Sequence, residues 1–193
     1  MPRVDNEKFY NSALQKHGIT AKGVHWFSQE TQEIRFDILQ EMLPSDLSSC
    51  TLADAGCGFG DFYLYLQKKQ NSPKKYIGID ALESMSRIAR ERTKCEIVTA
   101  DVCKDALPWA DYYVCSGAMN ILSAFETRLF IRNCYLACGG GFIFNILHGD
   151  KQSQTYNYIA SSQIKAIAKE LKVAAVHMKT DYLQNDITIG FFK

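Results

Sequence analysis

Hydrophobic and polar positions follow two different periods along the chain. Before residue 50, apolar residues recur at helical spacing: residues 4–17 predict a short amphipathic helix, and a second predicted helix begins at Ser28 and ends before Pro44. After residue 50, short apolar runs that predict strands buried on both faces alternate with helical stretches. The runs are TLADA, KYIGID, CEIVTAD, DYYVCSG and GFIFNIL, and the helical stretches cover residues 60–70, 82–93, 123–138 and 155–172.

This alternation predicts a parallel sheet with right-handed crossover connections. The last two runs, VAAVHMK and DITIGFF, are separated only by TDYLQN, which is too short for a crossover helix and therefore predicts an antiparallel hairpin. The expected fold is α/β, a doubly wound, mostly parallel seven-stranded sheet with a C-terminal antiparallel hairpin. We expect residues 1–50 to form a helical N-terminal cap or lid and residues 51–193 to form the cofactor-binding domain, in one compact unit.

Composition narrows the class of protein. The 193 residues are 47% hydrophobic, which suffices for one sizeable core. The net charge is +1 and the basic residues form no stripe, so we expect no nucleic-acid partner. No apolar run approaches the roughly 20 residues that span a bilayer, which predicts a soluble, cytoplasmic protein without membrane contact. Seven cysteines without a CxxC pair or a neighbouring histidine predict reduced thiols and no metal site.

The segment LADAGCGFGD forms a glycine-rich turn after the first predicted strand. Ligands of open α/β sheets bind beyond the carboxyl ends of the strands, where glycines allow close approach of the backbone, so we expect a cofactor there. Asp80 and Asp101 end the next two strands, where an acid can bind ribose hydroxyls or cap the following helix. Asp54 and Asp61 flank the turn with no Lys or Arg between them, which disfavours a pyrophosphate and favours a cationic ligand.

The motifs DAGCGFGD, YIGID, TADV and ADYYVCSGAMN resemble the successive motifs of class I S-adenosylmethionine-dependent methyltransferases over residues 50–193. The preceding GVHWFSQETQEIRF resembles the lead-in of a bacterial group of methyltransferases with no settled substrate. The resemblance implies S-adenosylmethionine as cofactor. It assigns Asp54, Gly56, Cys57 and Gly58 to the methionine portion, Asp80 and Ala81 to the ribose side, Asp101 and the Val102 backbone to adenine, and Ser116 to the vicinity of the methionine end.

The sequence indicates the residues near the methyl acceptor less clearly than those near the cofactor. Methyl transfer is an in-line displacement that needs a base only when the acceptor arrives protonated. Asn120 and His148 follow the fourth and fifth strands and are the candidate catalytic residues. Histidine is a common general base, so His148 could act as base, or it could be an ordinary loop residue. Trp26 either covers the site or anchors its loop. Arg35 either binds the methionine carboxylate or pairs with acids on its own helix.

These observations predict an S-adenosylmethionine-dependent methyltransferase with a small-molecule acceptor. One alternative is a noncatalytic S-adenosylmethionine-binding sensor or interaction module, because a fold alone does not fix a function. Another is an NAD-dependent oxidoreductase, although the spacing G-x-G-x-G departs from the dinucleotide pattern G-x-G-x-x-G.

Overall fold

The computed structural model describes residues 4–193. Helices and strands alternate from residue 51 onward, as the apolar pattern predicts. In chain order the elements are α1 (Asn6–His17), the 3-10 turn η1 (Ala21–Val24), α2 (Gln29–Met42), β1 (Thr51–Ala55), α3 (Asp61–Lys68), β2 (Lys75–Asp80), α4 (Glu83–Thr93), β3 (Glu96–Thr99), β4 (Ala110–Ser116), the 3-10 turn η2 (Ala118–Ile121), α5 (Ala124–Ala137), β5 (Cys138–Leu147), α6 (Ser161–Glu170), β6 (Ala175–Lys179) and β7 (Asp186–Phe192).

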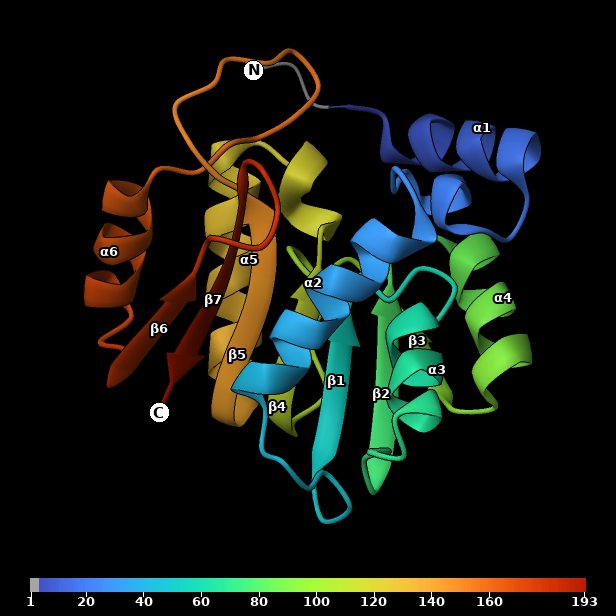
Figure 1. The fold of residues 1–193 in the computed structure, drawn as a ribbon, viewed down its shortest axis with the longest axis horizontal. Helices are drawn as coiled ribbons and strands as arrows, with labels where there is room; N and C mark the ends of the chain where they lie inside the picture. Colours follow the sequence, from blue (N-terminus) through green and yellow to red (C-terminus); the bar gives the residue numbers. More distant parts are fainter. Residues whose placement is uncertain (1–3) are drawn as a thin grey trace.

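The seven strands form one sheet in the order β3-β2-β1-β4-β5-β7-β6 (Figure 1). Strands β1 to β5 pair in parallel, whereas β7 runs antiparallel to both β5 and β6. The predicted doubly wound sheet with its C-terminal hairpin is therefore confirmed. The order of the strands in the sheet reverses direction between β1 and β4. Open α/β sheets bind their ligands at such a switch point.

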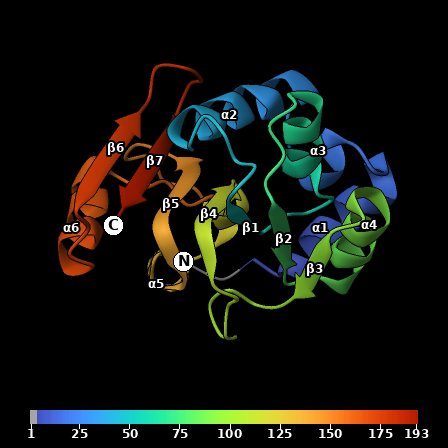
Figure 2. The same cartoon turned by 90° about the horizontal axis from the view of Figure 1, so that it is seen from below.

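Helices cover both faces of the sheet, with α2 and α3 on one face and α5 and α6 on the other (Figure 2). Successive strand residues point to opposite faces, so each strand contributes to two cores. Leu52 of β1 packs in the cluster that contains Phe36 and Leu39 of α2. Its neighbour Ala53 joins the opposite cluster, which contains Ile131 of α5. Both faces are thus buried, which explains why the strand sequences are apolar throughout.

The expected N-terminal lid is smaller than residues 1–50. Phe36 and Leu39 of α2 are 3% and 0% exposed, so this helix belongs to the core rather than to a cap. In α1, by contrast, only Ala13 is buried. Of the N-terminal segment, α1 and η1 alone lie beyond the strand ends, on the same side as the loop that precedes α6 (Figure 1).

The helix boundaries follow local chemistry. Ser28 caps α2 as predicted, and its side chain and that of Thr31 bond reciprocally to each other's backbone N–H groups. The last helix begins at Ser161 rather than near residue 155. Residues 148–160 form a loop instead, because the Ile159 N–H donates to the Leu147 carbonyl and the Asn157 N–H donates to the Asn120 carbonyl. These bonds hold the loop over the carboxyl edge of the sheet.

Candidate functional site

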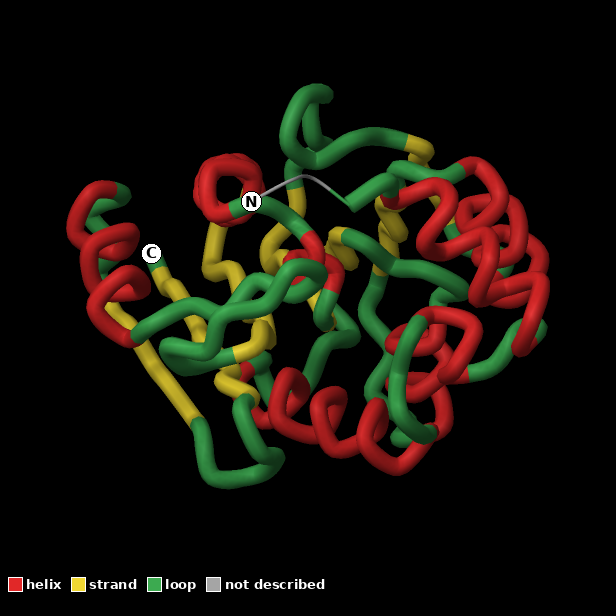
Figure 3. Tube along the Cα trace, turned by 90° about the horizontal axis from the view of Figure 1, so that it is seen from above, coloured by secondary structure: helices red, strands yellow, loops and turns green. Residues whose placement is uncertain are grey.

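A cavity of about 520 Å³ opens at the carboxyl ends of β1, β2 and β4. Viewed toward this edge, loops cross over the strand ends between helices on either side (Figure 3). The floor of the cavity consists of strand ends and the glycine-rich turn, and residues of α1, η1 and the loop before α6 contribute to its lining. The site therefore forms where the chain topology predicts a ligand crevice.

The glycine-rich turn requires its glycines. Gly56 and Gly58 have φ angles of 77° and 54°, in the left-handed region that disfavours other residues. A Cβ atom on Gly56 would lie 2.3 Å from the Cβ atom of Ala118. The backbone N–H groups of Gly56 and Cys57 donate to the Ile79 carbonyl, which ties the turn to the end of β2. The turn is thus fixed in shape, with no side chain between its backbone and the cavity at Gly56.

Asp80 accepts hydrogen bonds from two loops that line the cavity. One carboxylate oxygen accepts the Gly58 N–H at 2.9 Å and the other accepts the Leu82 N–H at 3.0 Å. Burial raises the pKa of Asp80, and the backbone N–H donors oppose that effect. A carboxylate has lone pairs beyond these two bonds, so Asp80 can also accept from ligand hydroxyls.

Asp54 is a buried acid, only 3% exposed, at the end of β1. The Tyr76 hydroxyl donates to it at 2.7 Å. Burial raises the pKa of Asp54 to about 7, the Tyr76 hydrogen bond opposes this, and the charges of Asp80 and Asp61 add to it. A cation in the cavity would favour the ionised form of Asp54.

The lining of the cavity is acidic. No Lys or Arg lines it among the residues that the structure describes, whereas seven carboxylic acids do: Asp5, Glu7, Asp54, Asp61, Asp80, Asp101 and Glu126. Cations outside the lining pair with three of them, since Arg92 lies 2.6 Å from Asp61, Lys104 lies 2.6 Å from Asp101 and Lys8 lies 3.6 Å from Asp5. The arrangement favours cations and disfavours an anionic pyrophosphate.

Ten of the eleven residues expected to bind the cofactor line this one cavity: Trp26, Asp54, Gly56, Cys57, Gly58, Asp80, Ala81, Asp101, Val102 and Ser116. These residues lie close together because β1, β2 and β4 are neighbouring strands that end at the same edge of the sheet. Trp26 lies against Gly117, where an added Cβ atom would meet the indole ring at 2.4 Å. Trp26 therefore both lines the cavity and anchors its loop to the end of β4.

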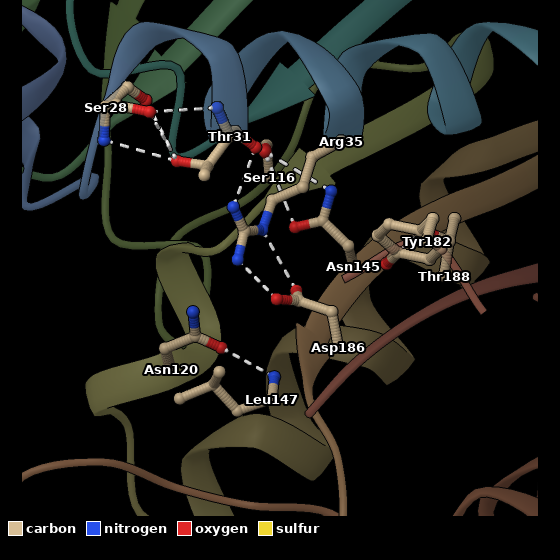
Figure 4. Close-up of polar contacts among 10 residues, drawn as sticks. All are labelled: Ser28, Thr31, Arg35, Ser116, Asn120, Asn145, Leu147, Tyr182, Asp186 and Thr188. Atoms are coloured by element: carbon tan, nitrogen blue, oxygen red, sulfur yellow. Dashed lines mark hydrogen bonds and ion pairs between the residues drawn. The ribbon is translucent and has the colours of Figure 1, made fainter. Parts of the chain in front are cut away.

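Arg35 is the exception, and the structure corrects its expected role. It does not line the cavity. Its Nε donates to Asp186 at 3.0 Å, its Nη2 also pairs with Asp186, and its Nη1 donates to the Thr31 carbonyl (Figure 4). The guanidinium also lies 4.4 Å from the Trp26 ring centroid. Arg35 is thus a buried ion-pair partner that ties α2 to β7, rather than a cofactor ligand or a surface residue.

The two candidate catalytic residues lie in different parts of the structure. Asn120 lines the cavity, and its side-chain oxygen accepts the Leu147 N–H at 3.0 Å (Figure 4). His148 lies outside the cavity, in a second cleft beside residues 180–186, and its Nε2 is 3.0 Å from the Ser161 hydroxyl. The structure thus does not bring His148 to this cavity, because β5 extends to Leu147 before that residue is reached.

Several polar residues that line the cavity are not among the predicted site residues. Tyr10 comes from α1, Gln32 from α2 and Tyr156 from the loop before α6. Gln32 is 6% exposed, and its Nε2 donates to Asp61 at 3.2 Å. Helical periodicity identifies an apolar face, but it does not show which polar residues beside that face meet a ligand.

Comparisons with known proteins agree with this geometry. Residues 52–141 match a family model described as a methyltransferase domain. Human N-acetylserotonin methyltransferase in complex with S-adenosylmethionine has a similar structure, with a TM-score of 0.72 and 15% identity over 98% of this chain and 60% of that one. Magnesium protoporphyrin IX methyltransferase of Synechocystis PCC 6803 with bound S-adenosylhomocysteine gives 0.69 and 13%, over 85% of this chain and 83% of that one. A search of curated protein sequences gave no match.

The strand order places the chain among doubly wound α/β proteins with a reversed last strand. Together with the match of residues 52–141 to a methyltransferase domain, this fold supports a class I S-adenosylmethionine-dependent methyltransferase with S-adenosylmethionine as its cofactor. The narrower resemblance of residues 23–36 to one bacterial group stays a prediction. Within residues 4–193, every helix is too short or too polar to cross a membrane.

Proposed function

We propose that this protein methylates a small-molecule acceptor that binds in the cavity beside the cofactor. The observation that carries the proposal is the enclosure of the cavity: α1, η1 and the loop before α6 all contribute to its lining. A macromolecular acceptor would have to displace these segments, whereas a small molecule fits beneath them. The two similar enzymes are named for small molecules, N-acetylserotonin and magnesium protoporphyrin IX.

The cavity fits the cofactor chemically. S-adenosylmethionine carries a sulfonium and an ammonium, and the acid-lined cavity supplies carboxylates for both charges. We assign Asp54 and the turn at Gly56 to the methionine portion, as the sequence resemblance implies. Asp80 accepts from the ribose hydroxyls, and Asp101 lies on the adenine side. The glycine turn is compatible with this role because its backbone faces the cavity without a side chain at Gly56.

The methionine carboxylate then needs a partner other than Arg35. Gln32 is a polar side chain of α2 that lines the cavity, and its Nε2 has a second N–H beyond the one donated to Asp61. The ring N–H of Trp26 is a second neutral donor on the same wall. We assign the carboxylate to these two residues and the neighbouring backbone amides.

The protein contributes positioning more than acid–base chemistry. When bound, the cofactor supplies a methyl group on a positively charged sulfur. The strand-end residues hold the reacting centre in one place, and α1 and the loop before α6 exclude water from it, which together supply much of the rate of an in-line transfer.

A turnover assay tests the proposal. The purified protein is incubated with S-adenosylmethionine and a small-molecule extract, and the formation of S-adenosylhomocysteine is followed. We expect formation that depends on both the extract and the protein, and that falls in the variant Asp80→Ala. A noncatalytic sensor would bind the cofactor without turnover, so binding without extract-dependent product would contradict the proposal.

A further inference from the structure

The acceptor side of the cavity lies beneath α1, and its chemistry limits the class of acceptor. This inference rests on the proposed methyl transfer and concerns the atom that receives the methyl group. The relevant groups are the polar side chains that α1 directs toward the cavity, the charges of the lining and the available bases.

Two polar side chains of α1 face the cavity. Asn6 and Tyr10 are one helical turn apart, and both line the cavity. The side-chain oxygen of Asn6 is buried and has no hydrogen-bond partner among residues 4–193. Buried acceptors are normally satisfied, and leaving one unpaired costs free energy, so this pattern indicates a donor on the ligand.

Tyr10 lines the cavity together with Asp80 and Tyr156. Its pKa is raised by burial and by the charges of Asp80, Cys115 and Tyr156, which come from β2, β4 and the loop before α6. These three elements surround the end of β1, where the turn at Gly56 begins. The Tyr10 hydroxyl stays protonated at neutral pH, so it can hold an acceptor but does not remove its proton.

The cavity offers no histidine base for an alcohol or a phenol. His25 lines it, but the ring stacks on Phe9 with centroids 3.7 Å apart and its Nε2 is 3.0 Å from the Phe9 carbonyl oxygen. His148 lies outside. The remaining bases of the lining are carboxylates, which are weak bases for a hydroxyl group. A hydroxyl acceptor must lose its proton to react, whereas an uncharged nitrogen has a reactive lone pair without a base.

The acid lining also disfavours an acceptor that carries a negative charge. A carboxylate acceptor would enter a cavity lined by seven acids and, among the described residues, by no Lys or Arg. With a nitrogen acceptor, the positive charge moves from sulfur to nitrogen and stays beside those acids. The lining therefore stabilises the charge before and after transfer.

We propose that the acceptor is an uncharged nitrogen compound, held beneath α1 by Asn6 and Tyr10 and methylated on nitrogen. The nitrogen lone pair forms the new N–C bond, and the electron pair of the broken C–S bond remains on sulfur as a neutral thioether. The methylated nitrogen becomes cationic and, where it still carries a hydrogen, releases a proton to water. Asn6 and the Tyr10 oxygen accept N–H groups of the acceptor and so position its lone pair.

The test uses the chemical stability of the transferred label. A small-molecule extract is separated at neutral pH into cationic, neutral and anionic fractions, and each is incubated with the full-length protein and methyl-labelled S-adenosylmethionine. We expect label in the neutral or cationic fraction, stable to alkali and attached to nitrogen in the carbon NMR spectrum of the product; label attached to oxygen, sulfur or carbon would overturn this inference. Label confined to the anionic fraction, or released by alkali as methanol from a methyl ester, would overturn this inference but leave the methyltransferase function intact. Label in no fraction would contradict both.

Variants then test the two side chains. Asn6→Leu and Tyr10→Phe should each raise the KM for the labelled fraction about three- to tenfold, the loss of one hydrogen bond, with S-adenosylhomocysteine affinity unchanged. Matched controls are Asn11→Leu, on α1 but bonded to Ser84 away from the cavity, and Tyr63→Phe on α3. Equal effects in the controls, or weaker cofactor binding in the test variants, would overturn the assignment of Asn6 and Tyr10.

Discussion

Asp54 couples cofactor binding to pH. Its pKa of about 7 in the folded protein lies above the ordinary value of 3.8, so the folded chain binds an extra proton between these values. The free energy of unfolding therefore falls as pH rises through 7, and the stabilisation by the neutral form is fully present only below the ordinary pKa. A cationic ligand instead favours the ionised form of Asp54, because it interacts favourably with the ionised carboxylate.

We expect the affinity for S-adenosylmethionine to rise between pH 5.5 and 7, by at most about tenfold per pH unit for each acid that ionises. This range lies below the pKa of the ligand's α-amino group, about 7.7–8.0, so the ligand stays cationic. Calorimetric titration of the wild type and Asp54→Asn measures the effect. The variant should show a flatter profile and, without ligand, greater stability than the wild type at pH 8. An equally steep profile in Asp54→Asn would assign the titration to another group.

Asp80 supports the ribose side and two loops at once. Its replacement by Ala removes the acceptor for the Gly58 and Leu82 N–H groups as well as for the cofactor. We expect Asp80→Ala to weaken S-adenosylhomocysteine binding by about 1.5–3 kcal/mol, the scale of a hydrogen bond to a charged group. Calorimetry gives the affinity, and unchanged binding would remove Asp80 from the site.

The proposed contact of Gln32 with the methionine carboxylate can be tested with a ligand that lacks this group. Decarboxylated S-adenosylmethionine retains the sulfonium and the amine but has no carboxylate. Gln32→Leu should weaken S-adenosylmethionine binding roughly tenfold and leave the decarboxylated ligand nearly unaffected. Gln29→Leu is the matched control, because Gln29 lies on the same helix and bonds to Glu33 at the surface. Equal losses for both ligands would mean that Gln32 does not contact the carboxylate.

At the scale of elements, the Arg35–Asp186 pair fixes α2 against β7. Asp186 is 3% exposed, and burial raises its pKa while the hydrogen bond and charge of Arg35 oppose the rise. The pair lies beside a polar group of Asn145 and Ser116, and Tyr182 bonds to Thr188 nearby (Figure 4).

We expect Arg35→Met to lower the free energy of unfolding by about 3–5 kcal/mol, because it leaves the Asp186 carboxylate buried and unpaired. The double variant Arg35→Met with Asp186→Leu should recover most of that loss, since the remaining side chains are apolar. Urea unfolding of the two single variants and the double variant gives the coupling energy. Additive losses would show that the two side chains do not depend on each other.

The same elements show what the sequence could predict. The strands followed from apolar runs, and the turn at Gly56 with Asp54 and Asp80 followed from their positions at strand ends, because parallel topology brings those ends together. The partner of Arg35 could not be predicted, because Asp186 is distant in sequence and its position depends on how β7 pairs with β5. His148 was misplaced because β5 extends to Leu147 beside β7.

At the scale of the whole molecule, the sheet is well packed on both faces, whereas helix α1 has few buried contacts with the rest of the protein. The two large cores lie on the faces of the sheet and contain no residue of α1. Tyr10 and Leu14 of α1 pack against a small cluster of Phe59, Met85 and Ile88. A segment with few buried apolar contacts opens locally at low free-energy cost, so α1 is the part best suited to admit ligands.

The last prediction concerns α1. If the closed position of α1 helps to form the cofactor site, a ligand that binds only the closed form adds RT ln(1 + [L]/Kd) to the cost of opening, about 2.7 kcal/mol at a ligand concentration of 100 Kd. Amide hydrogen exchange in residues 4–28 and 148–160 should then slow by up to about a hundredfold with S-adenosylhomocysteine. Exchange in the buried face of α5, around Ile131 and Cys134, should change less, because those amides already open only with the core. Protection confined to the strand ends, with unchanged exchange in residues 4–28, would show that α1 does not close over the cofactor.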